Sequence, residues 1–196
     1  MCGIAGILTP QADADDQRRV VAMQHALRHR GPDDGGTWQS ASRQATLGHT
    51  RLAILDLSTA GHQPMSAAGR WTITFNGEIY NFKELRRTLE QRGLDVRSQS
   101  DTEVILRAYQ AFGESCVEHL RGMFALAIWD EQERTCLLAR DRFGIIRSIT
   151  MCVTAAWYLR LKSGPCSPPV WCRAISTARR SMGIFAPGRC RIPEPC

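Results

Sequence analysis

The sequence lacks two features that would place the protein in or beyond a membrane. It has no uninterrupted run of about 18 apolar residues, the length that a membrane-spanning helix requires. Its first residues also lack the basic segment followed by an apolar segment that is typical of a signal peptide. We therefore expect a cytoplasmic protein that does not contact a membrane, with 196 residues that suffice for one domain.

Paired cysteines are missing as well, although the chain has eight cysteines. No two of them form a CxxC pair, which argues against a structural zinc site. Disulfides are rare in the cytoplasm, so we expect neither a metal site nor a disulfide framework. Five of the eight lie after residue 146: Cys152, Cys166, Cys172, Cys190 and Cys196.

Acidic residues are almost absent from the last quarter of the chain. Residues 147–196 hold eight Lys or Arg and one Asp or Glu, whereas residues 1–146 hold 17 and 18. The net charge of +6 therefore comes from the C-terminal stretch alone. Such a basic stretch is typical of nucleic-acid binding, which is one alternative function to consider.

The hydrophobic pattern predicts strands and helices in an irregular order. Because there is no regular βαβ alternation, we expect an α+β fold with antiparallel sheets. The predicted strands cover residues 2–8, 45–55, 71–75, 123–129 and 135–140, and the predicted helices cover residues 15–29, 82–92 and 101–112.

Three local features refine this pattern. The strand at 71–75 is expected to stop at Asn76-Gly77, a dipeptide typical of turns. The segment 28–36 is rich in turn-forming residues and is expected to be a loop. Asn81, with Glu84 three residues later, predicts a capping box at the start of a helix.

Cys2 is a candidate nucleophile because of its position. Removal of Met1 would leave a residue that carries both a thiol and an α-amine whose pKa is near ~8, so much of the amine is neutral. A neutral amine beside a thiol is a nucleophile with its own general base. The alternative is an ordinary second residue whose thiol packs against a strand.

Other polar residues suit a substrate that carries a carboxylate, an ammonium group and a carbonyl. Arg51 can bind a carboxylate with two parallel hydrogen bonds, and Asp101 can accept from an ammonium group. The side chain of Asn76 and the N–H of Gly77 can stabilise an oxyanion. Taken singly, these residues are equally typical of a surface arginine, a turn and a helix N-cap, and their spacing does not show that they converge.

A series of motifs resembles one known family. The strings MCGIAGI, RHRGPDDGG, LGHTRLAILDLS, GHQPM, TFNGEIYNFKELR, SDTEVIL, GMFALAIWD and LARDRFGI occur in this order over residues 1–145. They resemble the glutaminase domain of glutamine-hydrolysing asparagine synthetases, a branch of the class II glutamine amidotransferases. The LGHTRLAILDLS and NGEIYNF motifs are more similar to this branch than to the sugar-phosphate or purine-pathway enzymes.

The resemblance implies a four-layer αββα N-terminal-nucleophile hydrolase sandwich and a role for each matching residue. Cys2 would be the nucleophile, and Asn76 and Gly77 would form the oxyanion hole. The residues implied in glutamine binding are Arg51, Leu52, Ala53, Ile54, Leu55, Asn76, Gly77, Glu78 and Asp101.

The resemblance also implies a ligase of asparagine biosynthesis, of which this chain alone is at most a glutaminase. Glutamine would be hydrolysed to glutamate and ammonia through a Cys2 thioester, and the ammonia would amidate aspartate. The glutaminase step needs no cofactor, whereas ATP and Mg belong to a C-terminal synthetase domain that the sequence does not contain. Glutamine is the implied substrate, and the family is compatible with a dimer.

The resemblance breaks after residue 145. Within an incomplete amidotransferase domain over residues 2–196, we expect residues 2–145 to match the family, residues 146–191 to be translated out of frame, and residues 192–196 to resume a family-like sequence. With each codon begun one base earlier, residues 147–150 can encode PLYY, and residues 156–190 can encode the family's ASEIRALL-like helix. The basic charge and most of the cysteines would then be artefacts of the frame change and would not indicate a binding partner.

The frame change also has a structural consequence. The stretch lacks the alternation and the helical stripe that the sandwich needs, and Pro165, Pro168 and Pro169 interrupt regular structure. The alternatives are a divergent C-terminal extension, an inactive glutamine-binding remnant, and a basic nucleic-acid-binding protein.

Overall fold

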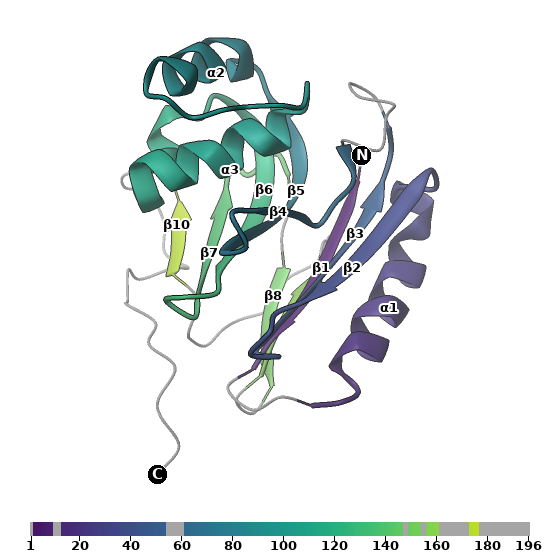
Figure 1. Cartoon of the computed structure of the whole chain (residues 1–196). Helices are drawn as coiled ribbons and strands as arrows, with labels where there is room; N and C mark the ends of the chain where they lie inside the picture. Colours follow the sequence, from purple (N-terminus) through teal and green to yellow (C-terminus); the bar gives the residue numbers. More distant parts are fainter. Residues whose placement is uncertain are drawn as a thin grey trace.

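The computed structural model describes residues 2–9, 13–53, 61–146, 149–153, 156–160 and 173–176. In these residues, two β-sheets face each other, with α1 outside one sheet and α2 and α3 outside the other (Figure 1). The elements are β1 (Gly3–Leu8), α1 (Asp16–Leu27), η1 (Arg28–Arg30), β2 (Asp34–Gln39), β3 (Ala45–Arg51), β4 (Met65–Ala67), β5 (Trp71–Ile79), α2 (Phe82–Gln91), α3 (Asp101–Phe112), η3 (Gly113–His119), β6 (Gly122–Asp130), β7 (Thr135–Arg140), β8 (Ile149–Val153), β9 (Ala156–Arg160) and β10 (Arg173–Ser176).

Each described sheet has five strands. The first has the order β2-β3-β1-β9-β8 and is antiparallel throughout, and α1 packs on β1 and β3. The second has the order β10-β7-β6-β5-β4, and α3 packs on β4 and β5. All its pairs are antiparallel except β10 with β7, which are parallel. The predicted αββα sandwich is confirmed, with this one parallel pair added.

Side-chain alternation along the strands divides the interior into separate clusters. On β5, Ile73, Phe75 and Ile79 pack in the core beneath α2 and α3. The alternate residue Thr74 faces the first sheet, where its hydroxyl donates to the carbonyl of Gly48 at 3.3 Å. Asn76 shares the face of Thr74 because successive side chains in a strand point to opposite sides. Its side chain is therefore directed between the sheets.

Two local predictions are wrong. The strand β5 does not stop at Asn76-Gly77 but continues to Ile79, because these residues pair with the start of β6. The segment 28–36 is not entirely a loop, because β2 begins at Asp34 and is held by six pairs with β3. Strand pairing between distant segments overrides the local turn preference in both cases.

The predicted capping box at Asn81 is also wrong. Asn81 does precede α2, but its side chain makes no capping bond. Its amide instead donates to the carbonyl of His119 and accepts the N–H of Arg121, both at 2.9 Å. Asn81 therefore joins the start of α2 to the start of β6.

The stretch after residue 146 contains regular structure that its sequence pattern does not predict. β8 and β9 extend the first sheet, and β10 extends the second. The expectation of no strand is therefore wrong for these segments, whereas Pro165, Pro168 and Pro169 lie outside the described residues. None of the helices in the described part of the chain is long and apolar enough to cross a membrane.

Candidate active site

A cavity of about 200 Å³ opens between the two sheets. It is smaller than the roughly 300–1,000 Å³ of pockets that take drug-sized ligands, so it suits a ligand of amino-acid size. Of the predicted site residues, those that line it are Cys2, Arg51, Leu52, Asn76, Gly77, Glu78 and Asp101. The structure thus brings together residues that are up to 99 positions apart in the chain.

Cys2 lies immediately before β1, with its side chain on the inner face of the first sheet. Ile4 and Leu8, which share its parity, pack between the sheets. The N–H of Leu52 points at the Cys2 sulfur over 3.3 Å, and the thiol lies 3.7 Å from the Leu52 carbonyl. These two contacts with the backbone of Leu52 hold the Cys2 sulfur at the wall of the cavity.

Arg51 ends β3 at the wall of the cavity, and only 8% of it is exposed. Gly61 packs directly on its guanidinium: a Cβ at residue 61 would lie 2.2 Å from Arg51 Nη2. Glycine at position 61 therefore leaves the space that the buried guanidinium occupies. A guanidinium in this position can bind a carboxylate through two hydrogen bonds.

Asn76 and Gly77 present hydrogen-bond donors at the opposite wall. Asn76 is 2% exposed, and its Nδ2 has no acceptor among the described residues. A buried donor without a partner is costly, so this NH₂ group indicates a place for a ligand oxygen. Gly77 has φ = +151°, and a Cβ there would lie 2.1 Å from the carbonyl oxygen of Met123, so no other residue fits.

Asp101 is the first residue of α3 and is 6% exposed. Its Oδ2 accepts the N–H of Ile79 at 3.1 Å, which fixes the carboxyl at the end of β5. Burial, with a smaller contribution from the neighbouring carboxylate of Glu78, raises the pKa of Asp101 to about 6. A cationic ligand would oppose both effects, which makes Asp101 suited to an ammonium group.

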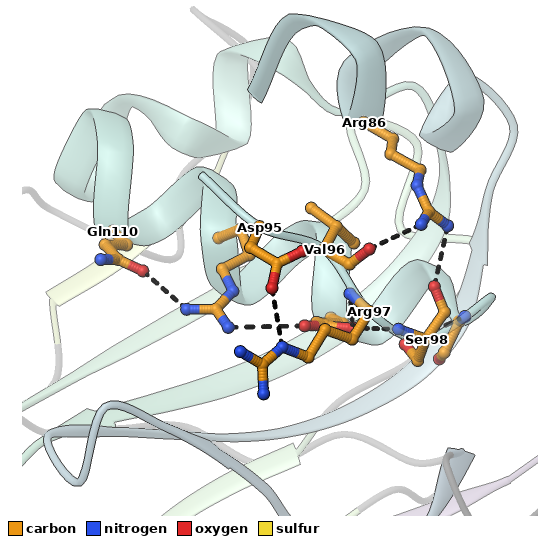
Figure 2. A network of polar contacts seen from close by, with 9 residues as sticks. Arg86, Asp95, Val96, Arg97, Ser98 and Gln110 are labelled. Carbon is orange, nitrogen blue, oxygen red and sulfur yellow. Dashed lines mark hydrogen bonds and ion pairs between the residues drawn. The ribbon is translucent and has the colours of Figure 1, made fainter. Parts of the chain in front are cut away.

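The segment before Asp101 is held by side chains from two helices (Figure 2). Arg86 of α2 donates to the carbonyls of Val96 and Ser98, at 2.6 and 2.8 Å. Glu103 of α3 accepts the N–H groups of Arg97 and Ser98, at 3.0 and 2.6 Å. Since this segment has no strand partner, these side chains fix the chain that leads to Asp101.

Two predicted residues are not placed and one is peripheral. Ile54 and Leu55 lie outside the described residues, so their predicted role stays a prediction. Ala53 is not part of the cavity wall, and its N–H donates to Asp33 Oδ2 at 2.9 Å near the surface.

Four polar residues of the cavity wall were not predicted as site residues: His49, Gln63, Ser100 and Thr102. His49 has a signal in the strand pattern, because it precedes Arg51 by two positions and so lies on the same face. Gln63 belongs to the GHQPM motif, but no periodicity indicates that its side chain is buried.

Comparison with known proteins identifies the family of this chain. A family model described as "Glutamine amidotransferase domain" matches residues 1–149. The chain belongs to the glutamine amidotransferases. Its domain is of class II and resembles the N-terminal domain of glutamine-hydrolysing asparagine synthetases.

Curated relatives support this placement in the family. The chain is 40% identical over 149 residues to glutamine-hydrolysing asparagine synthetase 3 of Bacillus subtilis, covering 74% of this chain and 24% of the relative. It is 41% identical over 147 residues to an asparagine synthetase of Triphysaria versicolor, with the same coverages. The amidotransferase chain thus spans about a quarter of the length of these relatives.

Solved structures share the amidotransferase fold. Glutamine phosphoribosylpyrophosphate amidotransferase from Bacillus subtilis superposes with a TM-score of 0.68 at 20% identity, covering 81% of this chain and 41% of the other. A structure described as the allosteric regulatory enzyme of purine biosynthesis gives a TM-score of 0.64 at 22% identity, covering 82% and 42%. The fold is therefore the α+β N-terminal-nucleophile hydrolase type.

Proposed function

We propose that this domain hydrolyses glutamine to glutamate and ammonia, with Cys2 as the nucleophile. The observation that carries the proposal is the convergence of Cys2, Arg51, Asn76 and Asp101 on one small cavity. A thiol, a guanidinium, an unpaired amide donor and a carboxylate match the carbonyl, the carboxylate and the ammonium group of one glutamine molecule.

The proposed reaction has two steps and requires that Met1 is removed. The α-amine of Cys2 takes the thiol proton, and the sulfur attacks the side-chain carbonyl carbon of glutamine. Asn76 Nδ2 and Gly77 N–H stabilise the oxyanion. The amine then gives its proton to the leaving nitrogen, ammonia departs, and water hydrolyses the γ-glutamyl thioester to glutamate and free thiol.

The rest of the site would position glutamine. Arg51 holds the α-carboxylate, with help from the backbone of Leu52 and the residues that follow it. Asp101 accepts from the α-ammonium group, and Glu78 adds negative charge beside it. No part of this step needs a metal or a cofactor.

The destination of the ammonia is proposed from the names of the relatives. They are asparagine synthetases, and the ammonia would amidate aspartate in an ATP- and Mg-dependent domain that corresponds to the remaining three quarters of those proteins. The amidotransferase domain itself would supply only the glutaminase step.

A second candidate is a remnant that binds glutamine without turnover. The observation that favours it is that the family match covers residues 1–149 and not the remainder of the chain. The cavity residues would then bind glutamine, but the thioester would not form.

The effect of Cys2→Ala on glutamate release separates the two candidates. We expect the intact chain, with Met1 removal verified by mass spectrometry, to release glutamate, and the variant to release none above background. The variant should still bind glutamine in calorimetry, because the contacts to the two charged groups remain. Glutamine binding without turnover in the unsubstituted chain would favour the remnant, and equal turnover in both proteins would contradict a Cys2 mechanism.

A further inference from the structure

The backbone N–H and carbonyl groups of Phe75 are bonded by side chains rather than by a neighbouring strand. β4 pairs with β5 from Trp71 to Ile73 and does not reach Phe75. The N–H and carbonyl groups of a residue in an antiparallel strand point to the same side, and this side alternates along the strand. Those of Phe75 face away from β6, toward the missing continuation of β4.

Gln63 replaces one half of the missing strand pairing. Its Oε1 accepts the N–H of Phe75 at 2.7 Å. Gln63 is 6% exposed and lines the cavity. An unmatched buried N–H is destabilising, so this bond fixes the position of the Phe75 peptide.

His49 supplies the other half. Its Nε2 lies 3.1 Å from the carbonyl oxygen of Phe75, and a carbonyl can only accept, so Nε2 carries the proton. Burial lowers the pKa of His49 to about 4. The imidazole is therefore neutral near pH 7, and the bond does not depend on pH there.

The amide nitrogen of Gln63 bonds a second residue of the cavity wall. Its Nε2 donates to the hydroxyl of Thr102 at 3.2 Å. Phe75 directly precedes Asn76, and Thr102 directly follows Asp101. The side-chain amide of Gln63 thus links Phe75 to Thr102. Phe75 is the neighbour of the proposed oxyanion donor, and Thr102 is the neighbour of the proposed ammonium acceptor.

We propose that Gln63 is a positioning residue that holds the oxyanion donors Asn76 and Gly77 at a set distance from Asp101. The inference rests on the proposed glutaminase reaction. Glutamine has its ammonium group and its side-chain carbonyl at opposite ends of a short chain, so the distance between Asp101 and the oxyanion donors must match the length of that chain. A displacement near 1 Å in such a site can reduce the rate about a hundredfold.

The first experiment compares three variants of the whole chain. Gln63→Met keeps the size of the side chain and removes both bonds, and we expect kcat for glutamine hydrolysis to fall between about tenfold and a hundredfold. Thr102→Val removes only the second bond and should raise KM a few-fold while kcat changes less. Gln24→Met is the matched control, because Gln24 bridges the carbonyls of Gly36 and His49 on the outer side of the first sheet. Its kcat should be unchanged.

A double-substitution cycle separates positioning from general damage. If Gln63 acts through Asn76, Gln63→Met should lower kcat in the unsubstituted chain but much less in an Asn76→Ala background. Additive losses, or equal losses in Gln63→Met and Gln24→Met, would overturn the proposal.

Amide hydrogen exchange tests the same contact without any activity. The Phe75 N–H should exchange at least tenfold faster in Gln63→Met than in Gln24→Met, while the core amides of α3 keep their protection. If the unsubstituted chain has no glutaminase activity, the proposed function fails and this measurement alone decides whether Gln63 holds the Phe75 peptide. An unchanged Phe75 exchange rate would refute that role.

Discussion

The ionised carboxyl of Asp101 is expected to favour glutamine binding but to lower the stability of the folded chain. Its carboxyl is buried beside Glu78, and both the burial and the neighbouring carboxylate favour its neutral form. Under the proposed function, the ammonium group of glutamine would offset the cost of the buried carboxylate when it binds. Stability and binding should therefore depend on pH in opposite ways.

The stability of the chain should fall as Asp101 ionises. Its pKa is about 6 in the folded state against 3.8 for a free side chain, so the folded state binds the proton more tightly. The free energy of unfolding then decreases as the pH rises from about 4 to about 6 and stays lower above that range. We expect Asp101→Asn to match the unsubstituted chain near pH 4 and to be more stable above pH 6 in urea unfolding.

The same variant should bind glutamine poorly at every pH. In the unsubstituted chain, affinity for glutamine should fall below about pH 6, because a protonated carboxyl does not attract an ammonium group. Glu84→Gln, an exposed change in the first turn of α2, controls for the loss of charge at a helix N-terminus. An Asp101→Asn protein that is no more stable than the unsubstituted chain at pH 8 would contradict this account.

Between the helices α2 and α3, residues 96–98 form an irregular segment that is held by side chains of both helices. The side chains of Arg86 and Glu103 satisfy carbonyl and N–H groups that a strand would otherwise pair (Figure 2). Ser100 then caps α3 by accepting the N–H of Thr102 at 3.2 Å. The position of Asp101 therefore depends on contacts made by both helices.

Removing the hydrogen bonds that Arg86 donates to Val96 and Ser98 should weaken glutamine binding. Arg86→Met leaves two partly buried carbonyls without their donors, which costs roughly 1–3 kcal/mol of the free energy of unfolding. We expect KM for glutamine to rise more than kcat falls, because Asp101 rather than Cys2 is displaced. Arg87→Met is the matched control, since Arg87 is exposed on the same helix. Identical urea midpoints for the two variants would argue against a stabilising role of the Arg86 hydrogen bonds.

At the scale of the whole molecule, the two parts of the chain differ in origin under our proposal. Residues 2–145 follow the family, and we propose that residues 146–191 are translated out of frame before a family-like sequence resumes at residues 192–196. β8, β9 and β10 do complete the sheets in this stretch. Backbone pairing does not require the family's side chains, so these strands are compatible with either origin.

The nucleotide sequence across codons 140–196 tests the frame directly. We expect that a single-base deletion near codon 146 and a compensating insertion near codon 191 relate this gene to those of its relatives. A coding sequence that no such pair of changes brings into the family frame would establish a divergent extension instead. A corrected gene should encode the PLYY and ASEIRALL-like segments.

Ordered motifs made much of the site predictable. The positions of Cys2, Arg51, Asn76, Gly77, and Asp101 followed from the resemblance, and the structure places all of them on one cavity. The strands β2 and β4 were not predicted, because each is held by pairing with a neighbouring strand rather than by its own hydrophobic pattern. Gln63 escaped for a related reason, since its partners lie 12 and 39 residues away.

The sequence by itself determined the family, the layered α+β fold and the chemical groups available for catalysis. These depend on residue types in a set order, which are visible without coordinates. Only the tertiary structure decided which donors are left unpaired among the described residues, such as Asn76 Nδ2, and which side chains bond the backbone of Phe75, namely Gln63 and His49. Hydrogen bonds between distant segments depend on how the two sheets pack, and no local pattern in the chain records that packing.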